Sequence, residues 1–152
     1  MRINYTTPCS TDKLSDIRSF VRSQLTAIHL SEKDRYELIL AIDEACANAI
    51  IHGNQCDCSR NLELELEIKM DKIRVDIYDV GNYHPNESNW RKRTINDDIR
   101  DRKKGGLGLR LIHNIMDKVL YYNKGQVTVC SLMKQFKKNP KSAKNNTATH
   151  MA

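Results

Sequence analysis

The fold is decided by residues 41–53, which read AIDEACANAIIHG. Glu44 and Asn48 are four residues apart in this stretch, so a helix places both side chains on one face. A carboxylate can orient or deprotonate a hydroxyl, and a carboxamide oxygen can ligate Mg²⁺ without adding charge. A solvated polar pair is the simpler explanation, but alanines and isoleucines crowd this pair, and polar groups in apolar surroundings need partners. The stretch therefore predicts a helix that carries a chemical site.

Two helices are expected before residue 53. Ser31, with Asp34 three positions on, predicts a helix start, and Gly53 predicts its end, so this helix runs from residue 31 to about residue 52. A short strand at 3–6 and Ser10 or Thr11 as a cap precede an earlier amphipathic helix. Its apolar residues recur at three- and four-residue steps: Leu14, Ile17, Val21, Leu25 and Ile28.

After residue 60 the hydrophobic period changes from helical to alternating. Apolar and charged residues alternate over 62–69 and apolar and polar residues over 73–78, which predicts an antiparallel hairpin. Residues 81–106 show no period and predict a long loop. A third helix is expected from about 107 to 118, followed by a hairpin with strands at 119–122 and 126–133. This order predicts the α+β class: a two-layer α/β sandwich with a mostly antiparallel mixed sheet, covered on one face by about three helices.

Two further motifs could carry chemistry. Asp79-Val80-Gly81 ends a strand, where a carboxylate can accept the N6-amino proton of adenine, although an ordinary turn is the simpler explanation. Gly105-Gly106-Leu107-Gly108 opens the third helix, so its backbone N–H groups can reach a phosphate; a flexible hinge explains it equally well. No Gly-Lys-Ser/Thr follows, so this is not a P-loop. Each motif alone is weak, and their order and spacing are the informative feature.

That order, with a charged loop between the second and third motifs, resembles the GHKL (Bergerat-fold) ATPases. In that superfamily the motifs are the N box and the two glycine boxes, and the loop is the ATP lid. Within it, residues 41–53, 106–112 and 116–119 are similar almost position by position to small bacterial serine-protein kinases that act as anti-sigma factors. The likeness covers roughly residues 3–134.

The resemblance implies a site for ATP and Mg²⁺. It assigns Asn48 to the metal, Glu44 to the general base that takes the proton of a substrate serine, and Asp79 to the adenine amino group. Gly81 would leave room for the base, and Lys104 would neutralise charge on the γ-phosphate. The nucleotide is expected to lie against Lys104, Gly105, Gly106, Leu107, Gly108 and Leu109.

The resemblance also implies a serine-protein kinase that sequesters a sigma factor and phosphorylates a serine on a STAS-type anti-sigma-factor antagonist, as a homodimer. Two departures from the family pattern keep an alternative open. Tyr83 replaces the second glycine of the first glycine box, and Thr128 stands one step late after Gly125. The alternative is a non-catalytic ATP-binding module that acts by protein–protein contact alone. The presence of Glu44 favours the enzyme, because a pure binder needs no base.

Charge and composition limit the remaining function classes. The net charge is +6, but the excess lies in residues 91–104, with seven basic and three acidic side chains, and from Lys134 onward, with five lysines and no acid. This distribution makes direct nucleic-acid binding a weak hypothesis. We expect one domain over residues 1–134 and a disordered basic tail over 135–152. An odd number of cysteines, five, and no apolar run of about 20 residues predict a cytoplasmic protein with free thiols and no membrane span.

Overall fold

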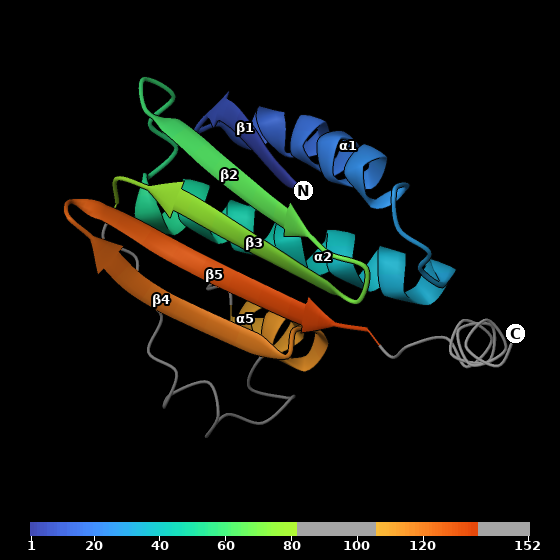
Figure 1. Ribbon diagram of the computed structural model, residues 1–152. Helices are drawn as coiled ribbons and strands as arrows, with labels where there is room; N and C mark the ends of the chain where they lie inside the picture. Colours follow the sequence, from blue (N-terminus) through green and yellow to red (C-terminus); the bar gives the residue numbers. More distant parts are fainter. Residues whose placement is uncertain (82–105, 137–152) are drawn as a thin grey trace, which may run out of the picture.

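The computed structural model describes residues 1–81 and 106–136 (Figure 1). The described residues form one sheet and one layer of helices. Its first half contains β1 (Arg2–Pro8), a 3-10 turn η1 (Thr11–Lys13), α1 (Leu14–Leu25), α2 (Glu32–Asn48), a π-helical turn η2 (Ala49–Gly53), β2 (Asn61–Ile68) and β3 (Lys72–Asp79). Its second half contains α5 (Gly106–Ile115), β4 (Lys118–Lys124) and β5 (Val127–Gln135).

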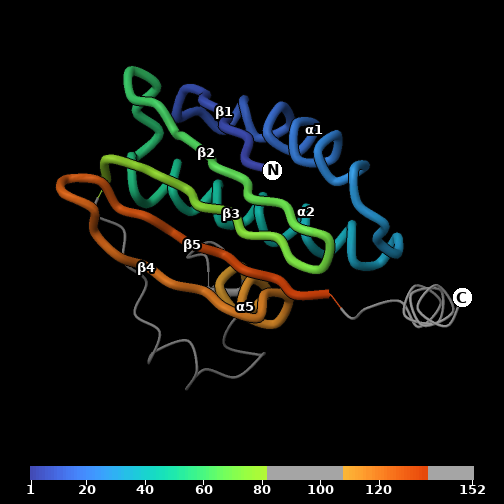
Figure 2. The backbone as a smooth tube through the Cα atoms, in the orientation of Figure 1, coloured from blue at the N-terminus to red at the C-terminus, as the bar shows by residue number. Residues whose placement is uncertain are grey.

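The five described strands form a sheet in the order β1-β2-β3-β5-β4. All four strand pairs are antiparallel, so this part of the sheet contains no parallel pair of the kind that a mixed sheet requires. The last hairpin inserts β5 beside β3 and leaves β4 at the edge. Figure 1 and Figure 2 show α1, α2 and α5 on one face of this sheet, with α2 between the other two. The predicted α+β two-layer sandwich is confirmed.

Strand alternation supplies the sheet's half of the core. In β2 and β3 every second side chain faces the helices and is buried: Leu62, Leu64, Leu66, Ile68, Ile73, Val75 and Ile77. The helices complete the core with the stripe that the sequence predicted: Ile17, Val21, Leu25, Leu38, Ile42 and Ile50. A single hydrophobic core therefore joins the two layers.

The helix ends follow local hydrogen bonding. Ser31 caps α2, because its hydroxyl accepts a hydrogen bond from the Asp34 N–H at 3.1 Å. The third helix ends at Ile115, three residues before the expected Lys118. The Asp117 N–H donates to the Met133 carbonyl at 2.9 Å, so the chain has already joined the sheet there.

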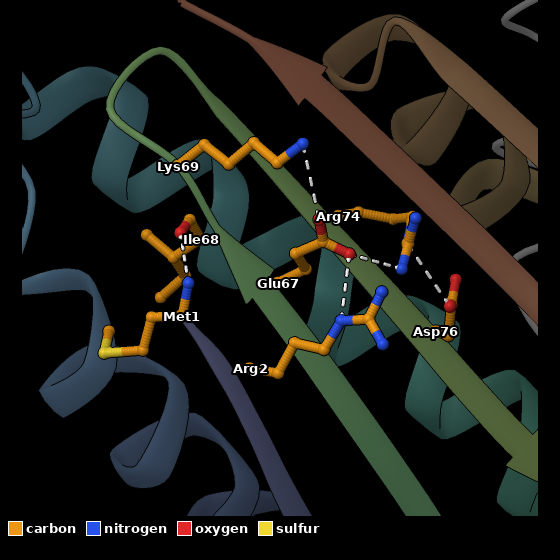
Figure 3. A network of polar contacts seen from close by, with 7 residues as sticks. All are labelled: Met1, Arg2, Glu67, Ile68, Lys69, Arg74 and Asp76. Carbon is orange, nitrogen blue, oxygen red and sulfur yellow. Dashed lines mark hydrogen bonds and ion pairs between the residues drawn. The ribbon is translucent and has the colours of Figure 1, made fainter.

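A charged network fixes the N-terminal strand on the outer face of the sheet (Figure 3). The Glu67 carboxylate lies 3.5 Å from Arg2 Nε and 3.5 Å from Lys69 Nζ, and it also binds Arg74. Desolvation would raise the pKa of Glu67, but these cations outweigh it and lower that pKa. The network lies away from the sheet end where β3 finishes at Asp79. It therefore stabilises the pairing of the first three strands and does not contribute to the candidate site.

Candidate functional site

The first part of the site lies on the last turns of α2. Glu44 is partly buried there, and its pKa is raised by burial and then by the neighbouring Asp43 carboxylate. Asn48 ends the helix with 5% of its surface exposed, and its buried Nδ2 has no hydrogen-bond partner within residues 1–81 and 106–136. The described residues therefore leave the Asn48 amide nitrogen, a hydrogen-bond donor, without an acceptor.

A π-helical turn, η2, directs the chain from α2 onto the end of β3. Such turns are rare and often occur at functional sites. Asn54 closes η2, since its backbone N–H and its side-chain Nδ2 both donate to the Ala49 carbonyl, at 2.9 and 3.2 Å. A Cβ placed on Gly53 would lie 3.1 Å from Asp79 Oδ1 and 3.3 Å from Oδ2. The turn therefore lays the Gly53 backbone directly on the Asp79 carboxylate.

Asp79 is the centre of the second part of the site. It is buried at the end of β3, where Oδ1 accepts a hydrogen bond from the Gly81 N–H at 2.7 Å. A Cβ on Gly81 would lie 1.9 Å from the Gly53 carbonyl oxygen, so only glycine fits there. The buried Thr128, which pairs with Asp79 across the sheet, donates its hydroxyl to the Gly81 carbonyl at 2.6 Å. Three segments thus hold one carboxylate.

The third part of the site is the N-terminal turn of α5. A Cβ placed on Gly108 would lie 2.5 Å from Glu44 Oε2, so α5 approaches α2 closely at this carboxylate. Helix N-termini carry partial positive charge and free N–H groups, which favour anions such as phosphate. Leu109 is buried, which anchors this turn in the molecule.

An open hollow of about 550 Å³ lies beside the Asp79 end of the site. Its walls include Gly53 and Gly81, together with the polar side chains of Asn54, Arg60 and Gln126. The end of α2, the end of β3 and the start of β5 converge in this region, on the left of Figure 1. The hollow is lined by Gly53 and Gly81, which contact Asp79, but not by Asp79 itself.

Most of the predicted site residues occupy this end of the fold. Glu44 and Asn48 lie on α2, Asp79 ends β3 with Gly81 just after it, and Gly108 lies on α5 against Glu44. Gly106 and Leu107 begin α5, and only their backbone is described. The predicted residues Lys104 and Gly105, and Tyr83 in the loop, lie outside the described part of the chain.

Sequence reasoning missed two contributors to the site. Gly53 was interpreted only as a helix stop, because the π-helical turn that carries it onto Asp79 has no sequence signature. Thr128 was interpreted as misplaced by one step, whereas its inward-facing position opposite Asp79 brings its hydroxyl to the Gly81 carbonyl. The alternation of β5 was the available signal, because it puts Thr128, Cys130 and Leu132 on one face.

The donor set fits a magnesium nucleotide. Mg²⁺ prefers oxygen ligands, which the Asn48 carboxamide can supply. The Asp79 carboxylate can accept an amino proton of adenine. The missing side chains of Gly53 and Gly81 let these two backbone segments pack against each other and against Asp79. The α5 N-terminus suits phosphate. The nucleotide site that the motifs predict stays a prediction for these residues.

The comparisons with known proteins point to one family. The sequence model of the family described as histidine kinase-like ATPase domain matches residues 7–134. Serine-protein kinase RsbW of Staphylococcus epidermidis is 31% identical over 135 residues, which cover 86% of this chain and 84% of the relative. The chain belongs to the RsbW family of histidine kinase-like ATPase domains. RsbW of Staphylococcus aureus strain MSSA476 is 30% identical over 135 residues, with the same coverage of 86% and 84%.

A solved structure gives the same fold for the RsbW family. The crystal structure of the RsbU and RsbW domains of Rv1364c from Mycobacterium tuberculosis matches with a TM-score of 0.63 at 15% identity. The match covers 89% of this chain and 32% of that one, so this chain spans about a third of the longer protein. At this identity the likeness supports the α+β fold and nothing finer. Within the described residues of this RsbW-family chain, no helix is both long and apolar enough to cross a membrane.

Proposed function

We propose that the chain is a Mg-ATP-dependent serine-protein kinase and anti-sigma factor. It would sequester a sigma factor and phosphorylate a serine on a STAS-type anti-sigma-factor antagonist, in the cytoplasm and as a homodimer. The observation that carries the proposal is the Glu44 carboxylate, which a non-catalytic binder does not need, placed against the phosphate-favouring N-terminus of α5. Family membership supports it, since the relatives are named serine-protein kinases.

Each residue has a task that follows from its surroundings. Glu44 accepts the proton of the substrate serine, and its raised pKa makes it a stronger base than an ordinary glutamate. Asp79 orients the adenine through its amino group, while the Gly53 backbone packs against Gly81 and against this carboxylate. Asn48 would hold Mg²⁺ through its carboxamide oxygen. When bound, Mg-ATP supplies the γ-phosphoryl group that the serine receives.

The product would act as a switch. A phosphoserine carries close to two negative charges at neutral pH, so it alters the surface on which it sits. Added charge on the antagonist would break its complex with the kinase and leave the chain to hold the sigma factor. Domain limits of 1–134, with a basic tail over 135–152, belong to the same proposal.

Calorimetric titration with ATP and Mg²⁺ tests the nucleotide site. We expect binding by the wild-type protein, loss of binding in Asp79→Asn, and loss of the Mg²⁺ dependence in Asn48→Ala. Asp76→Asn is the matched control, because Asp76 is a buried acid on the same strand but faces away from the helices and pairs with Arg74 at 3.4 Å. It should bind ATP like the wild type. A folded wild-type protein that binds no ATP would eliminate the kinase and leave a scaffold for protein contact.

Phosphoryl transfer from radiolabelled ATP to an antagonist protein tests the catalytic step. Glu44→Gln should retain ATP affinity and lose about 10²–10⁴-fold in rate, which is the usual contribution of a positioned base. ATP binding with no transfer by the wild type to any STAS-type acceptor would favour the non-catalytic module.

A further inference from the structure

Gly108 has no side chain at a point where any side chain would strike Glu44. The three described atoms nearest to a Cβ at this position all belong to that residue: Oε2 at 2.5 Å, Cδ at 3.5 Å and Cβ at 4.0 Å. Carbon and oxygen atoms that are not bonded do not approach to 2.5 Å, so one of them would have to move. The carboxylate is the end of a flexible side chain, whereas the helix backbones are fixed by packing, so the carboxylate would be displaced.

The backbone conformation does not explain the glycine. Gly108 lies within α5 and has no left-handed φ, so its backbone suits any residue. In a helix, glycine is less stable than alanine by about 1 kcal/mol. Gly125 shows the opposite case, because its φ of +65° favours glycine while nothing lies within 4 Å of its absent Cβ. The one obstacle to a side chain at Gly108 within the described protein is therefore the Glu44 carboxylate.

From this contact we infer that Gly108 is a positioning residue for Glu44: its missing side chain keeps the carboxylate at the α5 N-terminus. The inference rests on the proposed function, in which that carboxylate is the base. It differs from the phosphate contact that the family resemblance assigns to this glycine. A Cβ that obstructs phosphate weakens ATP binding, whereas a Cβ that displaces Glu44 lowers the rate after ATP has bound.

A double-mutant cycle on thermal stability tests the contact itself, without any assay of activity. Gly108→Ala is made in three backgrounds: wild type, Glu44→Gln and Glu44→Ala. Glutamine keeps the length of the side chain and therefore the collision, while alanine removes the atoms in contact. We expect Gly108→Ala to raise Tm by about 4 °C in Glu44→Ala, where only the helix-propensity gain remains. In the other two backgrounds that gain should be smaller, because the side chain at position 44 must be displaced from its contact first. The same Tm change in all three backgrounds would overturn the inference.

Kinetics and calorimetry test the positioning role. In the wild-type background Gly108→Ala should lower kcat for phosphoryl transfer by about tenfold or more. Its Kd for ATP in the presence of Mg²⁺ should stay within about threefold of the wild type. In the Glu44→Ala background it should cost no further rate. A large loss of ATP affinity, of equal size in the wild-type and Glu44→Ala backgrounds, would show that the Cβ obstructs the nucleotide and would overturn the inference.

The Tm cycle and the measurements of ATP binding and transfer together separate this inference from the proposed function. If the wild type binds no ATP, the kinase proposal fails, while the Tm cycle still shows whether Gly108 holds the Glu44 carboxylate in place. If ATP binds and phosphate is transferred but the Tm cycle shows no coupling, the kinase stands and the positioning role of Gly108 is wrong.

Discussion

Glycines lie against both carboxylates of the site, and at Gly53 and Gly108 the missing Cβ leaves room for the carboxylate. Gly108 leaves room for Glu44, and Gly53 lies against Asp79, with 3.1 Å between its absent Cβ and Oδ1. Gly81 also donates its N–H to Asp79 at 2.7 Å. The Cα side of a backbone segment can approach a carboxylate as closely as Gly53 does only where no Cβ intervenes. These glycines therefore fix the positions of the Glu44 and Asp79 carboxylates in the protein without a ligand.

The pH dependence of catalysis should report on Glu44. Burial, and then the charge of Asp43, raise the pKa of Glu44, and a base works only when deprotonated. We expect the acidic limb of the kcat/KM profile above the usual glutamate range, and at lower pH in Asp43→Asn, which removes a repelling charge. The same shift predicts how stability depends on pH. Because the pKa of Glu44 is higher in the folded than in the unfolded protein, protonation of Glu44 favours folding, and this contribution to stability is lost as the pH rises through the folded pKa.

Arg18 provides the control for that profile. Its Nη1 lies 3.0 Å from Asp43 Oδ1, so Arg18→Gln leaves the Asp43 charge less compensated. This variant should not move the acidic limb to lower pH. A profile that is unchanged in Asp43→Asn would show that the Asp43 charge does not act on the group that sets the limb.

Two alanine substitutions should differ in severity according to what each Cβ meets. In Gly81→Ala the Cβ would lie 1.9 Å from the Gly53 carbonyl oxygen, which cannot rotate away. The free energy of unfolding should therefore fall by at least about 3 kcal/mol. Gly53→Ala meets a side chain at 3.1 Å, and should cost about 1 kcal/mol while weakening ATP binding through Asp79. Denaturant unfolding measures both. Equal losses would contradict the packing of η2 against β3.

At the scale of the elements, the helix that decides the fold does not end as an ordinary helix. After Asn48 it continues into the π-helical turn η2, and Gln55 and Cys56 then adopt left-handed φ values of 53° and 57°. Such values are uncommon outside glycine and are retained where the surrounding structure imposes them. As a consequence, the regular part of α2 places Glu44 and Asn48 on one face. The π-helical turn that follows it places Gly53 against Asp79.

Periodicity explains how much of this could be predicted from sequence. The alternation of β2 and β3, and the apolar stripe of α1, predicted strands and helix because each has one buried face. The same rule put Glu44 and Asn48 on one face. It could not find Gly53, because a π turn obeys no hydrophobic period, nor the end of α5 at Ile115, because a backbone hydrogen bond to β5 decides that end. Contacts between distant segments were the unpredictable part.

The hydroxyl of Thr128 joins β5 to the turn after β3. It donates to the Gly81 carbonyl at 2.6 Å, much closer than the 3.4 Å to Asn123 Oδ1. Thr128→Val keeps the shape but leaves a buried carbonyl without this donor, which should lower the free energy of unfolding by about 1–2 kcal/mol and weaken ATP binding. Thr128→Ser keeps the donor and should retain most of both. If serine fails as badly as valine, the methyl group and not the hydrogen bond is responsible.

At the scale of the whole molecule, one core divides the cysteines into two classes. Cys9 and Cys46 are fully buried and Cys130 is 5% exposed, whereas Cys56 and Cys58 are exposed on the loop that leads from η2 to β2. Burial raises the pKa of Cys130 to about 12 and that of Cys46 well above its usual range. Burial, and then the nearby Asp79, also raise the pKa of Cys9. The three core thiols are therefore shielded from reagents and held in their less reactive protonated form.

Thiol titration with Ellman's reagent can test this division in the native protein. We expect two thiols per chain to react rapidly at neutral pH and all five to react in denaturant. The core thiols become accessible only when the structure opens, so they should react slower by about 10³-fold or more. A Cys56→Ser/Cys58→Ser variant should show no fast phase and keep its slow one. A third fast thiol in the wild type would mean that the core opens to solvent at one of the three buried cysteines, which would contradict the burial of Cys9, Cys46 and Cys130.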